Sequence, residues 1–168
     1  MRLRIQGHCR VVTSVAVSVA LATVLADTVL AVGRDKAMYL GGTLSAVEKK
    51  AQGKFDTQSE SELTFRAGKK GSVAIPYAAI ASLEFAQKEM RAIVIGFGPP
   101  VTKELAFYLT ITYSDREGTK QSGKFELGRD VVLDLLNVLE TRSGKKITFQ
   151  DTLTCEMYKT PQECAGKS

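Results

Sequence analysis

The clearest pattern of apolar and polar positions lies in residues 106–149 and predicts two paired strands followed by a helix. Residues 107–113 carry an apolar side chain at every second position, the period of a strand with one buried and one solvated face. The segment 115–118, DREG, interrupts this run, and its glycine suits the left-handed position of a short hairpin. Phe125 and Leu127 resume the alternation, so they predict the return strand of that hairpin.

After the hairpin, the apolar period changes to that of a helix, which we predict over residues 130–142. One stripe at three- and four-residue steps contains Val131, Val132, Leu135, Val138, Leu139 and Arg142. Asp130 suits the positive N-terminal end of such a helix, and the segment 144–146, GKK, suits its C-terminal end. An apolar stripe needs an apolar surface to cover, so we expect this helix to pack on the sheet.

The chain upstream of the hairpin reads as short strands separated by turns. The expected strands cover residues 37–47, 53–57, 63–65 and 73–75, with a further strand that starts at Ile80. A glycine pair at 41–42 leaves room for a bulge or a bend, and residues 67–71 have the composition of a hairpin loop. No linker or repeat divides residues 37–150, so we expect one unit of about seven strands and one C-terminal helix.

The apolar run at residues 92–97 has two interpretations. It is either a core strand, which we favour, or an exposed loop that docks on a membrane or a partner. The segment 98–100, GPP, ends the run in both cases. Burial of Ile93, Ile95 and Phe97 would exclude docking.

Residues 53–85 resemble the core of GRAM and pleckstrin-homology-like (PH-like) domains. There a glycine-led strand precedes an apolar-x-Phe strand, a loop, and Ile-Pro followed by an isoleucine and a Leu-Glu pair. The matching positions are Gly53, Leu63, Phe65, Ile75, Pro76, Ile80, Leu83 and Glu84. With the late hairpin and helix, residues 37–150 are also similar to exported bacterial domains of this type without an assigned activity. The resemblance implies a mainly β domain with a C-terminal α-helix, a PH-like, partly open, bent β-barrel capped by that helix.

The N-terminus has the composition of a targeting segment. Three arginines precede residues 11–26, sixteen residues without a charge, and small residues at Ala26 and Ala31 offer cleavage sites. This is the build of a secretory signal peptide, so we expect residues 1–31 to be removed and the rest to be exported, periplasmic or extracellular. The alternative is an uncleaved anchor, since residues 11–32 could cross a bilayer at about 20 residues per crossing. The abundance of Ala and Val favours cleavage.

The charge of the chain gives no support for a nucleic-acid partner. The formal net charge is +5, but removal of residues 1–31 leaves 20 Lys plus Arg against 17 Asp plus Glu, or +3. These basic residues are scattered among acidic ones, without a stripe interleaved with aromatic residues. We therefore predict no nucleic-acid binding.

The cysteines agree with export. Cys9 lies in the predicted signal, which leaves Cys155 and Cys164 as a pair that an oxidising compartment would bridge. We expect residues 151–168 to be a polar tail in which this bridge closes a small terminal loop and contributes about 2 kcal/mol. Their spacing is too wide for a CxxC redox motif, and no histidine nearby completes a zinc site.

Residues for catalysis are scarce. His8, the only histidine, lies in the predicted signal, so the mature chain would lack an imidazole base or metal ligand. The carboxylates are predicted to lie in loops, at solvent-exposed positions of strands or on the polar side of the helix. They are Glu60, Glu62, Asp115, Glu117 and Asp134. We predict no catalytic residue, no metal and no cofactor, and therefore a protein that is not an enzyme.

Two lysine-rich turns are the candidate ligand-binding positions. The candidates are Lys49, Lys50, Lys54, Lys69 and Lys70. Because some PH domains bind acidic headgroups through basic loops, the resemblance implies an anionic lipid or polysaccharide contact. The alternative is an ordinary solvated surface, since Glu48 and Asp56 dilute the first cluster.

Together these patterns favour an exported, non-enzymatic binding or scaffold module for an unknown protein or peptide. The peptide would add to a barrel edge or to the groove beside the helix, as in related phosphotyrosine-binding-type barrels. The alternative is a barrel that binds a small ligand or an anionic lipid at the envelope surface. An internal pocket larger than a side chain would favour the ligand, and a filled barrel with an unpaired edge strand would favour the module.

Overall fold

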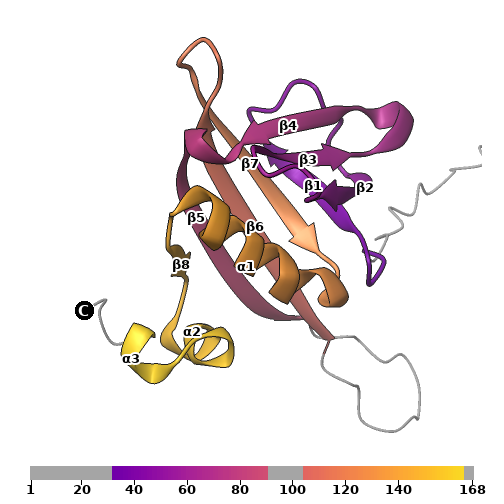
Figure 1. The fold of residues 1–168 in the computed structure, drawn as a ribbon. Coiled ribbons are helices and arrows are strands. Elements are labelled where there is room, and N and C mark those ends of the chain that lie inside the picture. The colour runs from indigo at the N-terminus through magenta and orange to yellow at the C-terminus, as the bar shows by residue number, and fades with distance from the viewer. Residues whose placement is uncertain (1–31, 91–103, 165–168) are drawn as a thin grey trace, which may run out of the picture. The chain divides into compact units, whose positions relative to one another are not determined.

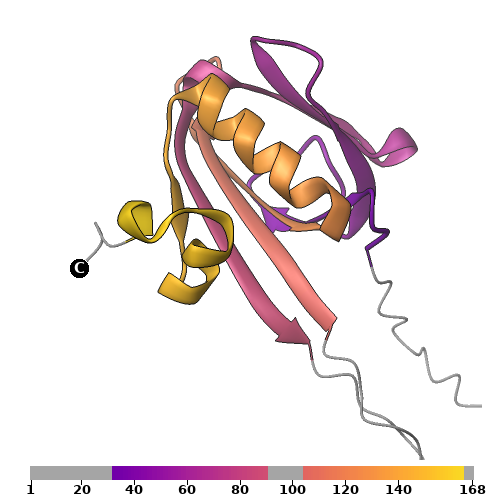
Figure 2. The same cartoon turned by 60° about the horizontal axis from the view of Figure 1, so that its bottom comes forward.

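Residues 32–90 and 104–164 are described by the computed structural model of the chain (Figures 1 and 2). All of them belong to the unit that comprises Ala31–Ser168. The predicted signal or anchor, residues 1–31, and the apolar run at residues 92–97 lie outside the described residues, so both remain predictions.

The described residues form eight strands, which pair into one sheet. The strands are β1 (Ala37–Gly42), β2 (Ala51–Asp56), β3 (Glu62–Arg66), β4 (Ser72–Pro76), β5 (Ile80–Met90), β6 (Glu104–Ser114), β7 (Lys120–Leu127) and β8 (Ile147–Phe149). The α-helices are α1 (Val132–Ser143), α2 (Thr152–Tyr158) and α3 (Pro161–Cys164), and the 3-10 helices are η1 (Gly68–Lys70), η2 (Tyr77–Ala79) and η3 (Arg129–Val131).

The strand order is β4-β3-β2-β1-β7-β6-β5-β8, which leaves β4 and β8 as the edges of an open sheet within the described part. Neighbouring strands are antiparallel except for β5 and β8, which are parallel. The sheet bends, and α1 lies against one of its faces (Figures 1 and 2). This arrangement confirms the predicted fold class, a mainly β, partly open bent barrel that is capped by one C-terminal helix.

The core lies between the bent sheet and α1. Phe125 of β7 is fully buried at the centre of an aromatic cluster. Its ring centroid lies 5.5 Å from that of Tyr39, 5.0 Å from Phe55 and 5.1 Å from Phe65. The helix contributes Val132, Leu135, Leu136 and Leu139. Leu136 was not part of the predicted stripe, so the buried face of α1 is wider than the sequence indicated.

The ends of the predicted helix have different outcomes. The first turn is 3-10, and α1 begins at Val132. Asp130 does not cap the helix through its side chain, because its carboxylate pairs with the Arg34 guanidinium at 3.1 Å instead. At the other end the prediction is confirmed. Gly144 adopts a left-handed φ of 66°, and its N–H donates to the Glu140 carbonyl at 3.0 Å.

The predicted hairpin turn after β6 and the predicted bulge in β1 are also present. Gly118 has a φ of 80° in the hairpin between β6 and β7. The Asp115 carboxylate accepts hydrogen bonds from the Gln121 side chain and from backbone N–H groups of that turn, which together lower the pKa of Asp115. β1 contains the expected bulge, which lies between Tyr39 and Gly41, but the strand ends at Gly42, and the predicted extension to residue 47 is a loop.

The C-terminal segment differs most from the sequence-based expectation. β8 was not predicted, and residues 152–164 form two helices where we expected a polar tail with a terminal loop. Tyr158 of α2 packs edge-on against Phe85 at 5.2 Å between ring centroids, and Cys155 is buried. The Asp151 carboxylate caps α2 by accepting the N–H of Thr154 at 2.7 Å. The segment is therefore packed on the sheet.

Candidate functional site: a cavity beside the disulfide

The structure puts four of the five candidate lysines on two neighbouring loops. The Glu48 N–H donates to the Lys70 carbonyl at 3.0 Å, which joins the β1–β2 loop to η1. Lys49 and Lys50 therefore lie on one loop, and Lys69 and Lys70 on the next, all of them exposed. Ligand binding at these lysines stays a prediction.

The fifth candidate lysine, Lys54, is placed differently. It lies on β2, and its ammonium pairs with the Asp35 carboxylate at 2.5 Å.

The two lysine loops meet closely because residue 71 is a glycine. Gly71 has a φ of 106°, and a Cβ on it would lie 1.9 Å from the Ala46 carbonyl oxygen.

A cavity of about 310 Å³ lies outside the barrel core, between the end of α1, β8 and the helices α2 and α3. We call it the C-terminal cavity. Its apolar lining includes Ile147, Phe149 and the two bonded cysteines, and its charged lining is Glu140, Lys145, Lys146, Asp151, Lys159 and Glu163. The barrel interior, by contrast, is occupied by the side chains of the hydrophobic core.

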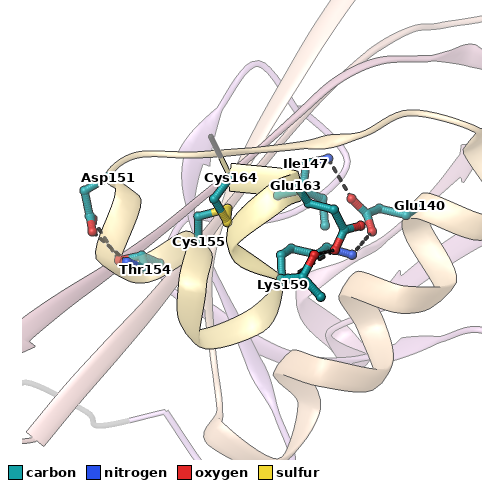
Figure 3. The surroundings of a disulfide bond; sticks show 9 residues. Glu140, Ile147, Asp151, Thr154, Cys155, Lys159, Glu163 and Cys164 are labelled. Carbon is teal, nitrogen blue, oxygen red and sulfur yellow. Dashed lines mark hydrogen bonds and ion pairs between the residues drawn. A yellow bond between two sulfur atoms is a disulfide. The ribbon is translucent and has the colours of Figure 1, made fainter. Parts of the chain in front are cut away.

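The predicted disulfide is present and forms part of the cavity lining (Figure 3). It joins Cys155 of α2 to Cys164 at the end of α3, with 5.9 Å between the Cα atoms. Because the ring it closes contains the second half of α2 and all of α3, the bond holds α3 beside α2.

Glu140 connects the elements around the cavity. Its carboxylate accepts the backbone N–H of Ile147 at 3.0 Å and pairs with the ammonium of Lys159 (Figure 3). The Glu140 and Lys159 side chains are only 19% and 21% exposed, so the pair is partly screened from solvent. One carboxylate of α1 thus fixes both the start of β8 and the residue after α2.

The other carboxylates of the cavity are also engaged within the chain. Asp151 caps α2 through Thr154. Glu163 accepts the hydroxyl of Thr160 at 2.8 Å and its N–H at 3.1 Å. These hydrogen bonds lower the pKa of Glu163 and favour its ionised form.

The outer edge of β8 borders this cavity. The Gln150 N–H donates to the Phe85 carbonyl at 2.9 Å, which fixes the register of the parallel β5–β8 pair. In this register the peptide groups of Thr148 face β5, and those of Ile147 and Phe149 face away from it. Of the groups that face away from β5, the Ile147 N–H donates to the Glu140 carboxylate. The Ile147 carbonyl and the Phe149 N–H have no hydrogen-bond partner within the described residues.

The sequence analysis missed this site because its contacts join distant elements. Nothing in the local pattern links Glu140 to Lys159, which lies nineteen residues further along the chain. The available signals were the alternation of Ile147 and Phe149 and the spacing of Asp151 and Thr154, which suits a helix cap.

Comparisons with known proteins leave the site to be interpreted from its own geometry. No family model matches the chain, and neither a curated protein nor a solved structure is similar to it at a significant level. Within residues 32–90 and 104–164, no helix has the length and apolar character that a bilayer crossing requires. The same described residues contain no group of three or more His, Cys, Asp or Glu side chains arranged to hold a metal ion.

Replacement of both bonded cysteines by serine (Cys155→Ser with Cys164→Ser) is expected to lower the free energy of unfolding by about 2 kcal/mol. The lost cross-link no longer restricts the unfolded chain, and the short ring keeps the effect modest. Urea denaturation of the oxidised protein and the double variant measures the difference. A reducing agent should destabilise the unmodified protein by a similar amount and leave the double variant unchanged. Equal stability of all samples would contradict the prediction.

Proposed function

We propose that the chain is an exported, non-enzymatic, PH-like module that binds an extended peptide segment of another protein at the C-terminal cavity. The observation that carries this proposal is the outer edge of β8, where a carbonyl and an N–H that have no hydrogen-bond partner among the described residues border a cavity. An extended peptide uses such an edge for backbone hydrogen bonds and an adjoining pocket for a side chain. The cavity volume of about 310 Å³ is at the lower end of ordinary ligand sites and suits one or two side chains.

The filled barrel supports a peptide-binding module over a barrel that carries a ligand. Buried rings and aliphatic side chains occupy the space between the sheet and α1. The predicted signal peptide and the disulfide, a bond that persists in oxidising compartments, support export. The bent barrel with its C-terminal helix is the architecture that the resemblance to PH-like domains implies.

The position of the proposed peptide follows from the strand order. The edge of β5 beside α1 is covered at Leu83, Glu84 and Phe85 by β8 of the same chain. A peptide that adds beside the helix would therefore pair with the outer edge of β8.

Phe149→Pro is expected to weaken peptide binding at least tenfold, because proline removes the unpaired N–H and blocks close approach to the edge. The purified protein is first screened against a library of unstructured peptides, and the peptides that bind are then titrated by fluorescence anisotropy. Phe149→Leu is the matched control, since it keeps the N–H and an apolar side chain.

A second edge variant shows whether the peptide uses β4 instead. The Tyr77 N–H donates to Ser61 and the Ala67 N–H to the Gly71 carbonyl, so the peptide groups of Ala74 face away from β3. Ala74→Pro should leave binding unchanged. Loss of binding in Ala74→Pro with full binding in Phe149→Pro would contradict the proposed site.

The second candidate function is contact with an anionic lipid or polysaccharide through the two lysine loops. The hydrogen bond from Glu48 to Lys70 favours it, because it joins the loops that carry four exposed lysines. Co-sedimentation with vesicles that contain phosphatidylglycerol tests this function. Unchanged association after replacement of all four loop lysines by glutamate would exclude it.

A further inference from the structure

We propose that the peptide bound at the C-terminal cavity is acidic and presents a carboxylate to Lys145 and Lys146 beside an apolar side chain. This inference rests on the proposed function and names the class of its partner. It derives from the way in which the charges around the cavity are paired.

The carboxylates that line the cavity are occupied by groups of the chain itself. Glu140 binds Lys159 and the Ile147 N–H, Asp151 caps α2, and Glu163 accepts two hydrogen bonds from Thr160. None of them is therefore free to attract a basic ligand without the loss of an existing contact.

The lysines of the cavity are not balanced in the same way. Lys159 is paired with Glu140, but Lys145 and Lys146 form no ion pair within the described residues. Lys146 has only an electrostatic effect on Glu163, without a direct contact. This effect is the weakest of the contributions that lower the pKa of the Glu163 carboxyl. The cavity thus presents two exposed cations that have no bonded anion in the part of the chain that the structure describes.

These cations stand at the beginning of the β8 edge. Lys145 and Lys146 directly precede Ile147, whose carbonyl has no hydrogen-bond partner among the described residues, and the Phe149 N–H lies two residues further on. Ile147, Phe149 and the disulfide provide the apolar lining next to them. A peptide strand on this edge would therefore contact the two lysines at one end and the apolar lining of the C-terminal cavity along its length.

The lysines have a simpler structural role that the experiment has to separate from binding. Cations after the last turn of α1 complement the negative end of its dipole. That role affects stability and is indifferent to the charge of a peptide, so peptides of different charge distinguish the two roles.

The test uses three labelled peptides with one extended core of valine and threonine and with flanking residues that are all Glu, all Gln or all Lys. Each is titrated into the purified protein by fluorescence anisotropy at low and high salt. We expect the Glu peptide to bind about tenfold more tightly than the Gln peptide, and added salt to reduce this difference. The Lys peptide should bind most weakly.

Charge reversal at the cavity (Lys145→Glu with Lys146→Glu) should abolish the preference for the Glu peptide. The matched control, Lys49→Glu with Lys50→Glu, makes the same charge change on the β1–β2 loop and should retain that preference. Thermal denaturation checks that both variants fold, and Lys145→Gln with Lys146→Gln gives a milder change if reversal destabilises the protein.

The outcomes separate the two proposals. Equal binding of the Glu and Gln peptides, with Phe149→Pro still disruptive, would overturn the acidic partner and leave the peptide site intact. Failure of every peptide to bind, or binding that Phe149→Pro does not affect, would overturn both. Loss of the preference in the control variant alone would assign the charge effect to the lysine loops and overturn the inference.

Discussion

Phe125→Ala is expected to lower the free energy of unfolding by about 3–5 kcal/mol, the largest effect that we predict for a single substitution. Phe125 is fully buried, and its ring contacts those of Tyr39, Phe55 and Phe65. Alanine would leave a cavity between strands from both halves of the sheet, which cannot close without moving the other rings. A loss of this size is a large part of the total stability of about 5–15 kcal/mol of a typical domain.

Urea denaturation followed by circular dichroism measures this loss. Tyr108→Ala is the matched control, because Tyr108 is an aromatic residue of the adjacent strand β6 that is only half-buried and lies outside the ring cluster. We expect the control to lose much less stability than Phe125→Ala. Similar losses in the two variants would show that the ring cluster is not the centre of the core.

Arg142→Ala is expected to destabilise the fold by about 2 kcal/mol, because it removes hydrogen bonds from a charged donor and leaves their acceptors unpaired. The Arg142 guanidinium donates to the carbonyls of Thr57 at 2.5 Å and Ser59 at 2.7 Å. It also reaches the Tyr77 hydroxyl at 3.3 Å and lies over that ring. Arg142 thus ties the end of α1 to the β2–β3 loop and to η2.

Arg142→Lys separates the shape of the group from its charge. A lysine keeps the positive charge but lacks the planar set of donors that reaches both carbonyls, so we expect it to recover only part of the loss. Arg116→Ala, in the exposed hairpin turn, should change the stability by less than about 0.5 kcal/mol. Full stability of Arg142→Lys in thermal and urea denaturation would show that charge alone explains the contact.

The local pattern of the sequence was sufficient for most elements of the barrel. Alternation over residues 107–113 identified β6 and its buried face, because side chains of a strand point to opposite faces at successive positions. Gly118 and Gly144 marked a turn and a helix end, since each adopts a left-handed conformation that favours glycine. The disulfide followed from the pairing of two cysteines in a chain predicted to be exported.

The candidate site depended on contacts that periodicity does not encode. β8 contains three residues, too few to show a period, and it is a strand because β5 offers it an unpaired edge. Arg142 was assigned to the apolar stripe of the helix, but its partners are backbone carbonyls of a loop that lies far away in the sequence.

Local patterns were enough to predict the buried faces of the strands, most of the buried face of α1, the hairpin turn at Gly118 and the pairing of the two cysteines. The folded chain was needed to show that β8 covers β5, that Glu140 holds Lys159 and Ile147, and that the two lysine loops meet. The physical reason is that burial periodicity is a property of each segment, whereas a hydrogen bond or ion pair between distant segments exists only after the chain has brought them together.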